Sequence, residues 1–181
     1  MDRISVRPIA PADYDQAYAL QQEYLDVEPQ AKFIARIETQ PELYLVALDG
    51  CAVVGVCYGG PSAKVPSTCH VQGIAVNLDQ SLHYARKGIG SKMLSVFRTT
   101  AVRLGYQELG LGAAEDEKVE KFYLKNRFMA FELVAKQASG VEIARIPILD
   151  YESGVILRED LRRRYQPHEI IFIFRQSLCS D

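Results

Sequence analysis

The stretch ELYLVAL-DG-CAVVGVCYGG, residues 42–60, constrains the fold more than any other part of the sequence. Two runs rich in β-branched and aromatic residues flank Asp49-Gly50, a dipeptide that accepts the positive φ angles of a tight hairpin turn. The strands of a hairpin pair antiparallel. The sequence therefore excludes a plain doubly wound nucleotide fold, in which strands and helices alternate strictly.

The remaining patterns supply strands and helices on both sides of this hairpin. Strands are expected at residues 4–9, 69–77, 107–113, 129–137 and 168–176, with a strand or an extended arm at 141–149. Helices are expected at 12–25, from 29, at 88–104, from about 115 to 125 and, short and charged, at 157–166. This order predicts an α/β (α+β) fold with a mixed, mostly antiparallel central sheet flanked by helices. We expect one domain over residues 1–181, since no repeat, low-complexity tract or linker divides the chain.

Composition excludes several classes of partner. The 181 residues are 48% hydrophobic, enough for one sizeable core, and the formal charge of −2 gives no field that would gather nucleic acid. The start, MDRISVRPIA, lacks a secretory apolar region, and no stretch approaches the roughly 18 apolar residues of a membrane span. We expect a soluble, cytoplasmic protein without membrane attachment. The cysteines form no CxxC pair, so neither a metal site nor a disulfide framework is expected.

The segment YARKGIGSKML, residues 84–94, places two glycines at the start of a predicted helix. Gly88 and Gly90 let the main chain approach a ligand closely, and the first N–H groups of a helix converge on one point at the positive end of its dipole. The flanking polar residues that add charge or a hydroxyl are Arg86, Lys87, Ser91 and Lys92. The pattern indicates an anion site; a loop with two turn glycines and solvated cations is the alternative. A P-loop needs the pattern GxxxxGK followed by Ser or Thr, which the sequence lacks. The dinucleotide fingerprint needs a third glycine at position 93, where this sequence has Met93.

Two segments at the right spacing carry a resemblance to a known family. The sequence IAVNLDQSLHYARKGIGSKML, followed about twenty residues later by DEKVEKFYLKNRF, resembles the GCN5-related N-acetyltransferase (GNAT) superfamily over about residues 70–135. The resemblance implies acetyl-CoA as cosubstrate, with a pantetheine arm beside the backbone of Ile74, Ala75 and Val76. By the same resemblance, the pyrophosphate is held by Arg86, Lys87, Gly88, Ile89, Gly90 and Ser91.

Three residues depart from the pattern of that family. Ala85 stands where Gln or Arg is expected, so the bond that a Gln or Arg side chain would make there is absent. Asp116 stands where many relatives carry Asn near a helix start; it is expected at the cofactor site, or as an N-cap. Arg127 replaces the usual Gly, at a cost of about 1 kcal/mol unless Asn126 takes the left-handed conformation.

The resemblance also suggests an acid and a base for amide formation. Tyr123 matches the family tyrosine near the cofactor sulfur and is the candidate acid; a core tyrosine on an amphipathic helix is the alternative. His70 shares a strand face with Gln72, Ile74 and Val76 and is the candidate base; ordered water, with a packed or solvated histidine, is the alternative. An unpaired N–H of Val76, at a bulge, is a candidate oxyanion donor.

The acceptor amine is expected to contact the first two helices and the segment after residue 138. An aromatic and acidic group could receive a cationic amine, or form an exposed helix face: Tyr14, Tyr18, Glu23, Tyr24, Asp26 and Glu28. The basic run Arg158, Arg162, Arg163 and Arg164 could contact the outer phosphate of the cofactor or RNA. Because Glu159 and Asp160 are interleaved with it, a solvated helix is favoured over both.

These observations favour an acetyl-CoA-dependent N-acetyltransferase acting on a primary amine of a small molecule or protein. The alternative is a non-catalytic acyl-CoA-binding sensor or interaction module of the same fold. A nucleic-acid-binding domain is disfavoured by the net charge. The apolar last strand, IIFIF, is consistent with edge pairing in a homodimer.

Overall fold

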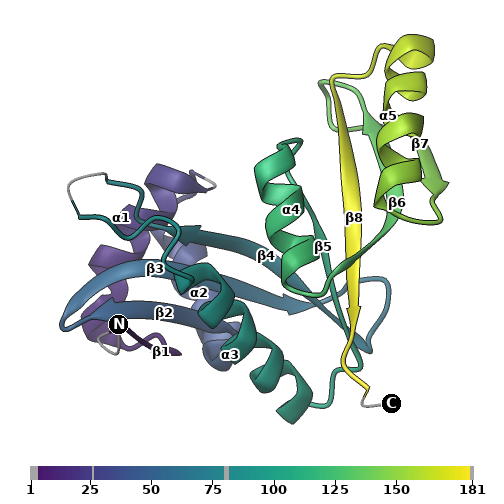
Figure 1. The fold of residues 1–181 in the computed structure, drawn as a ribbon. Helices are drawn as coiled ribbons and strands as arrows, with labels where there is room; N and C mark the ends of the chain where they lie inside the picture. Colours follow the sequence, from purple (N-terminus) through teal and green to yellow (C-terminus); the bar gives the residue numbers. More distant parts are fainter. Residues whose placement is uncertain (1–3, 26, 80–81, 180–181) are drawn as a thin grey trace. The chain divides into compact units, whose positions relative to one another are not determined.

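The computed structural model describes residues 4–25, 27–79 and 82–179 (Figure 1). By their contacts these residues form two compact units, one ending at Gln107 and the other spanning Glu108–Cys179. Every strand pair within the two units is antiparallel. The predicted class, mixed α/β with mostly antiparallel strands and flanking helices, is confirmed.

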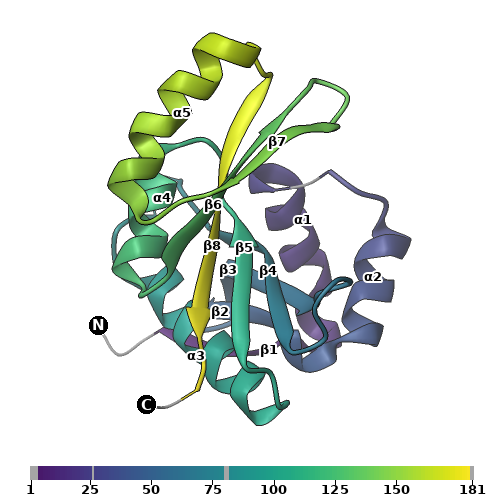
Figure 2. The same ribbon diagram turned by 90° about the vertical axis from the view of Figure 1, so that its right-hand side faces the viewer.

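The first unit contains a sheet with the strand order β1-β2-β3-β4. Its strands are β1 (Ile4–Pro8), β2 (Tyr44–Asp49), β3 (Ala52–Pro61) and β4 (Thr68–Val76), and its helices are α1 (Tyr14–Tyr24), α2 (Gln30–Thr39) and α3 (Ile89–Arg103), with 3-10 turns at Pro11–Asp13 and Pro41–Leu43. Helices α1 and α2 cover one face of the sheet, and α3 covers the other (Figures 1 and 2). Both faces are therefore buried, which explains the near-continuous apolar runs of β2 and β3.

The hairpin predicted at Asp49-Gly50 is confirmed. Asp49 pairs with Ala52, and Gly50 takes a left-handed φ of 62° in the two-residue turn between them. On the face below α1 and α2, Tyr44 stacks on Tyr58 with ring centroids 5.1 Å apart. The hairpin thus supplies the centre of the first unit's core.

The second unit contains a sheet with the order β5-β8-β6-β7. Its strands are β5 (Glu108–Gly112), β6 (Met129–Lys136), β7 (Glu142–Pro147) and β8 (Glu169–Ser177), and its helices are α4 (Glu117–Lys125) and α5 (Tyr151–Tyr165). Strand β8, which contains IIFIF, pairs with β5 on one side and β6 on the other. The expectation that this strand offers a free edge for a homodimer was wrong, because both of its edges are already paired.

Helix α5 is longer than the short charged helix predicted at residues 157–166. It begins after Asp150, whose carboxylate accepts a hydrogen bond of 2.8 Å from the backbone N–H of Ser153. Gly154, in the first turn, lies so close to Phe172 that a Cβ atom there would be 2.4 Å from the ring. The extra turns therefore depend on a local cap and on a close approach of the helix to the sheet.

Candidate active site

The predicted anion site lies at the start of α3. Gly88 is the N-cap residue, with a left-handed φ of 78°, and within the described residues no side chain caps the helix. The N–H of Lys92 already bonds to the carbonyl oxygen of Gly88 at 2.9 Å, so the earlier N–H groups of Ile89, Gly90 and Ser91 precede the first intrahelical bond. A Cβ atom at Gly88 would meet nothing within 4 Å. An open turn with converging donors fits a phosphate group.

The residues before Gly88 also have an unusual backbone. Arg86 takes a left-handed φ of 60°, two residues before the left-handed Gly88. Left-handed residues among such N–H groups make concave anion-binding turns. The hydroxyl of Tyr84 donates a hydrogen bond of 3.0 Å to Asp49, which ties this segment to the hairpin of the first unit. The side chains of Arg86 and Lys87 are exposed and can add positive charge to the turn.

Buried apolar residues fix the first turns of α3. Ile89 is 4% exposed and Met93 is fully buried. The methyl end of Met93 lies against Gly55, beside the carbonyl of Ala75 on β4. The ammonium of Lys92, expected near the turn, instead donates a hydrogen bond to the backbone carbonyl of Ile4. The positive side chains at the turn are therefore Arg86 and Lys87.

The residues of β4 alternate in burial, but they do not form the single face that was predicted. His70 and Gln72 are exposed, and Ile74 and Val76 are half-buried, whereas the alternate residues Val71, Gly73 and Ala75 are buried. The four residues expected on one face do not share it. Gln72 lies on the side of α2, whereas Ala75 packs in the core below α1 and α2, so its neighbours Ile74 and Val76 lie on the opposite face, the side of α3.

The β4 bulge lies at a different residue from the one expected. Tyr58 pairs with Gly73 and Gly59 pairs with Val71, which leaves Gln72 as the extra residue. Val76 lies in register with Gly55. A glycine permits this irregularity: a Cβ atom on Gly59 would be 2.0 Å from the carbonyl oxygen of His70.

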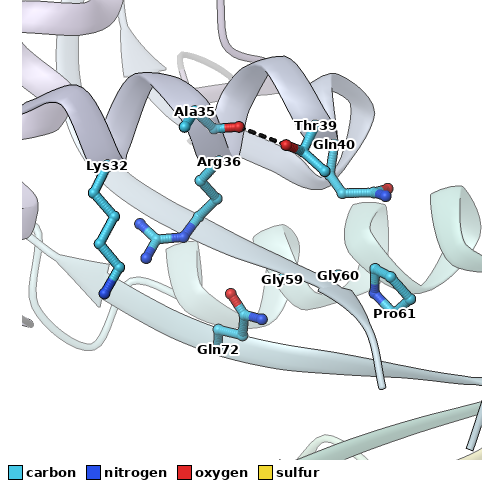
Figure 3. Close-up of a pocket in the computed structure, with 9 residues that line it drawn as sticks. All are labelled: Lys32, Ala35, Arg36, Thr39, Gln40, Gly59, Gly60, Pro61 and Gln72. Atoms are coloured by element: carbon cyan, nitrogen blue, oxygen red, sulfur yellow. Dashed lines mark hydrogen bonds between the residues drawn. The ribbon is translucent and has the colours of Figure 1, made fainter. Parts of the chain in front are cut away.

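A pocket of about 290 Å³ lies between α2 and strands β3 and β4. Figure 3 shows Lys32 and Arg36 directed from α2 toward the strand that carries Gln72, whose amide is directed back toward the helix. The other lining residues are Ala35, Thr39, Gln40, Gly59, Gly60 and Pro61. Sequence reasoning missed this pocket; the only signal was the pair of cations one turn apart in AKFIAR.

The acidic partner of the cations beside this pocket is Glu28. Arg36 bonds to both carboxylate oxygens of Glu28, and Gln21 donates a further hydrogen bond of 2.5 Å. Burial raises the pKa of Glu28, but the hydrogen bonds from Arg36 and Gln21 outweigh burial, so the pKa is lowered. Arg36 also stacks over the ring of Tyr58, 4.5 Å from its centroid.

This arrangement differs from the expected aromatic and acidic group for a cationic amine. The carboxylate of Glu28 is already paired with Arg36, and the hydroxyl of Tyr18 donates to the backbone carbonyl of Glu28 at 2.6 Å. Asp26, another member of that group, lies outside the described residues. The cations of α2, rather than the acids of the first helices, therefore face the pocket.

The other predicted site residues belong to the second unit. The carboxylate of Asp116 accepts hydrogen bonds from the N–H groups of Lys118 and Val119 at 2.7 and 3.2 Å, so Asp116 is the N-cap of α4. Tyr123, two turns into α4, is 7% exposed. Its ring packs among Phe122, Phe128 and Phe174.

The end of α4 resolves the question raised by Arg127. Arg127 itself is left-handed, with a φ of 69°, whereas Asn126 has a φ of −92°. The conformational strain of a Cβ atom in the left-handed region is therefore present at Arg127.

The predicted site residues are divided between the two units of the structure. Residues 86–91 and the site residues of β4 belong to the first unit, and Asp116 and Tyr123 to the second. Their roles toward a cofactor stay predictions. In the part of the chain that the structure describes, no three His, Cys, Asp or Glu side chains gather as metal ligands would, and no helix is both long and apolar enough to span a bilayer.

An antiparallel sheet, a glycine turn and an uncapped helix N-terminus are the features that the resemblance to the GNAT superfamily led us to expect. The sequence model of the acetyltransferase (GNAT) family matches residues 11–128. The chain therefore belongs to the GNAT family of acetyltransferases, which confirms the predicted family, enzyme class and acetyl-CoA cosubstrate. No curated protein sequence matches the chain closely enough to count as a relative.

Solved structures share this fold at low sequence identity. Ard1 from Thermoplasma volcanium has a TM-score of 0.70 at 16% identity, over 98% of this chain and 99% of that one. Arabidopsis thaliana Naa50, in complex with the bisubstrate analogue CoA-Ac-MVNAL, has a TM-score of 0.64 at 15% identity, over 97% and 99%. Diaminobutyrate acetyltransferase EctA from Paenibacillus lautus, in complex with L-2,4-diaminobutyric acid and coenzyme A, has a TM-score of 0.67 at 14% identity, over 98% and 97%.

Proposed function

We propose that this chain acetylates a primary amine of a small molecule or peptide, and that the turn before α3 holds the pyrophosphate of acetyl-CoA. One observation carries the proposal: α3 begins at the left-handed Gly88, and within the described residues no side chain caps it. Helix N-termini of this kind bind phosphate through backbone N–H groups. The exposed side chains of Arg86 and Lys87 add positive charge at the same turn.

Residues of both units have roles in this proposal. Acetyl-CoA supplies the acetyl group as a thioester. The backbone of Ile74, Ala75 and Val76 binds the pantetheine amides, as an added strand would. His70 accepts a proton on its imidazole, and Tyr123 holds a proton on its phenol oxygen until one is needed. Asp116 acts by fixing the start of α4 and hence the position of Tyr123.

The acceptor and the domain organisation are part of the proposal. Naa50 is complexed with a peptide-containing analogue and EctA with a diamino acid, which supports an amine acceptor in either class.

The family match over residues 11–128 crosses the boundary between the units at Gln107, which supports a single catalytic domain over residues 1–181.

A binding experiment tests the pyrophosphate site directly. Calorimetry compares coenzyme A with pantetheine, which lacks the phosphates, in the wild type and in an Arg86→Gln/Lys87→Gln variant. We expect the variant to bind coenzyme A about thirtyfold more weakly, since each of the two lost phosphate contacts contributes on the order of 1 kcal/mol, and to bind pantetheine as the wild type does. Lys118→Gln/Lys121→Gln, with exposed lysines of α4, is the control. Equal loss for both ligands, or none for coenzyme A, contradicts the proposal.

A further inference from the structure

We propose that the pocket between α2 and strands β3 and β4 binds an anionic group, a carboxylate or a phosphate monoester, of the acceptor whose amine is acetylated. This inference rests on the proposed function, because it names the acceptor class for the same reaction. The acceptor is then a small amine that also carries an acid.

The charge of the pocket lining is positive. Lys32 and Arg36 line it, and none of its lining residues is an acid. Gln72, Thr39 and Gln40 are neutral polar residues of the same lining, and amide N–H groups can donate to an anion. A cationic amine would meet repulsion at this surface.

Glu28 does not cancel this charge. Its carboxylate, 4% exposed, lies behind Arg36 and is bonded to both terminal nitrogens of that guanidinium. Lys32 lies 3.6 Å from the same carboxylate, but its side chain is 69% exposed. One acid therefore faces two cations, and a net positive charge remains.

Glu28 also makes Arg36 a rigid donor. The bidentate pair and the ring of Tyr58 fix the guanidinium plane, so little side-chain entropy remains to be lost when an anion binds. A guanidinium has more N–H donors than one bidentate pair uses, which leaves donors for a ligand. Lys32 supplies a mobile second cation at the rim.

The position of the pocket connects it to the candidate base. Gln72 lines the pocket, and His70 is the next residue on the same face of β4. Alternate residues of a strand are about 7 Å apart, which is the length of a short amino acid. An acid held beside Gln72 therefore leaves the amine of the same molecule within reach of His70.

The volume favours a small acceptor. At about 290 Å³ the pocket lies at the lower end of the range of about 300 to 1,000 Å³ for small-molecule sites. Gly59 and Gly60 form part of the wall, and no side chain projects from them. A surface ion pair between Lys32 and Glu28 is the competing explanation of the same contacts, and it predicts no ligand.

Matched pairs of amines distinguish these explanations by binding alone. Amide resonances of Gly59, Gly60 and Gln72 are followed by NMR, with coenzyme A present, during titration with 4-aminobutyrate or its amide, and with O-phosphoethanolamine or ethanolamine. We expect an anionic compound to shift these resonances and its neutral partner not to do so. The carboxylate and phosphate pairs identify which anion is preferred. Equal shifts within both pairs, or none, overturn the inference.

The variant Lys32→Met tests the charge, and Lys121→Met is the matched control, because Lys121 is about as exposed as Lys32 and also forms an i,i+4 ion pair, with Glu117. We expect Lys32→Met to raise the Kd of the anionic compound about two- to fivefold, and Lys121→Met to leave it unchanged. Equal Kd values for both variants overturn the inference.

A thiol-release assay with the same compounds separates the two proposals. Acetylation of both members of each pair at equal kcat/KM overturns the anion pocket and leaves the proposed function intact. Binding of an anionic compound in the pocket, with no turnover of any amine, supports the pocket and contradicts the proposed function.

Discussion

Arg158 of α5 donates a hydrogen bond of 2.5 Å to Glu120 of α4, whose side chain is fully buried. The hydroxyl of Tyr151 donates a second hydrogen bond of 2.6 Å to the same carboxylate. Burial and this hydrogen bond raise the pKa of Tyr151 to about 12, so the phenol stays protonated and remains a donor at neutral pH. Glu120 thus joins the helix that carries Tyr123 to α5 within the second unit.

The variant Arg158→Leu should strongly destabilise the protein. It leaves the carboxylate of Glu120 buried without its cation, a loss that typically costs about 3–5 kcal/mol. Urea unfolding measures the free energy. In the double variant with Glu120→Leu we expect much of this loss to be recovered, since the buried charge is gone. A double variant less stable than Arg158→Leu would show that the ion pair is not the main contribution.

The variant Arg127→Gly should stabilise the protein by about 1 kcal/mol. Arg127 has a φ of 69°, in the left-handed region that a Cβ atom disfavours and glycine accepts. Thermal or urea unfolding checks the change. Lys125→Gly, two residues earlier and still helical, is the control and should lower stability by about 0.5–1 kcal/mol. A destabilised Arg127→Gly would mean that the arginine side chain contributes more than the strain costs.

The variant Gly59→Ala should disrupt the junction between β3 and β4. Its Cβ atom would be 2.0 Å from the carbonyl oxygen of His70, a backbone atom that cannot move without the strand. Overpacking of this kind costs about 1–3 kcal/mol or more. At Gly60 the nearest atom to a new Cβ is 3.6 Å away, so Gly60→Ala should be far milder. Similar unfolding midpoints for the two variants would contradict the close approach.

Acid should weaken one ion pair of the first unit in a predictable direction. Arg7 donates to both carboxylate oxygens of Asp13, at 2.7 and 3.0 Å, and this holds the pKa of Asp13 below its ordinary value. Because the folded-state pKa is depressed, the stabilisation is present above the unfolded-state pKa of about 3.9 and is lost as pH falls through the folded-state pKa.

The difference in free energy of unfolding between wild type and Arg7→Met should therefore shrink from pH 7 to pH 3. Arg103→Met serves as the comparison, because Arg103 and Glu42 form an exposed pair with side chains 60% and 43% exposed. That variant should differ little from wild type at any pH. A wild-type advantage over Arg7→Met that is independent of pH would rule out the titration of Asp13.

The variant Tyr123→Phe tests the proposed acid. Removal of a general acid typically lowers the rate about 10²-fold, whereas the ring packing against Phe128 and Phe174 is retained. Thiol release measures kcat, and calorimetry should give an unchanged Kd for coenzyme A. Tyr165→Phe, at an exposed tyrosine of α5, is the control. Full activity of Tyr123→Phe would reassign the tyrosine to the core.

Sequence alone could predict the elements whose signals are local. The Asp49-Gly50 turn and the start of α3 at Gly88 both depend on residues next to one another in the chain. The start of α5 was not predicted, and its first turn contains Gly154, a residue type with low helix propensity. Its place in the helix follows from contact with Phe172, which is distant in sequence.

The same distinction holds for the candidate site. The glycine turn was visible as a motif, whereas the face of β4 was predicted wrongly, because the bulge at Gln72 interrupts the alternation of side chains. The pocket was not visible, since it requires Lys32 and Arg36 of one helix to meet Gln72 of a strand 36 residues beyond Arg36. The pairing of Glu28 with Arg36, which removes the expected acid from the surface, is likewise a consequence of tertiary packing.

Strand β8 occupies the space between β5 and β6, although it follows both of them in the chain. During synthesis, the backbone groups that β5 and β6 turn toward each other have no partner until residues 169–177 leave the ribosome. A nascent second unit halted before that point would expose two unsatisfied strand edges to chaperones and to other chains. Stalled or prematurely terminated translation products should therefore aggregate through this unit, whereas the first unit can complete its own sheet earlier.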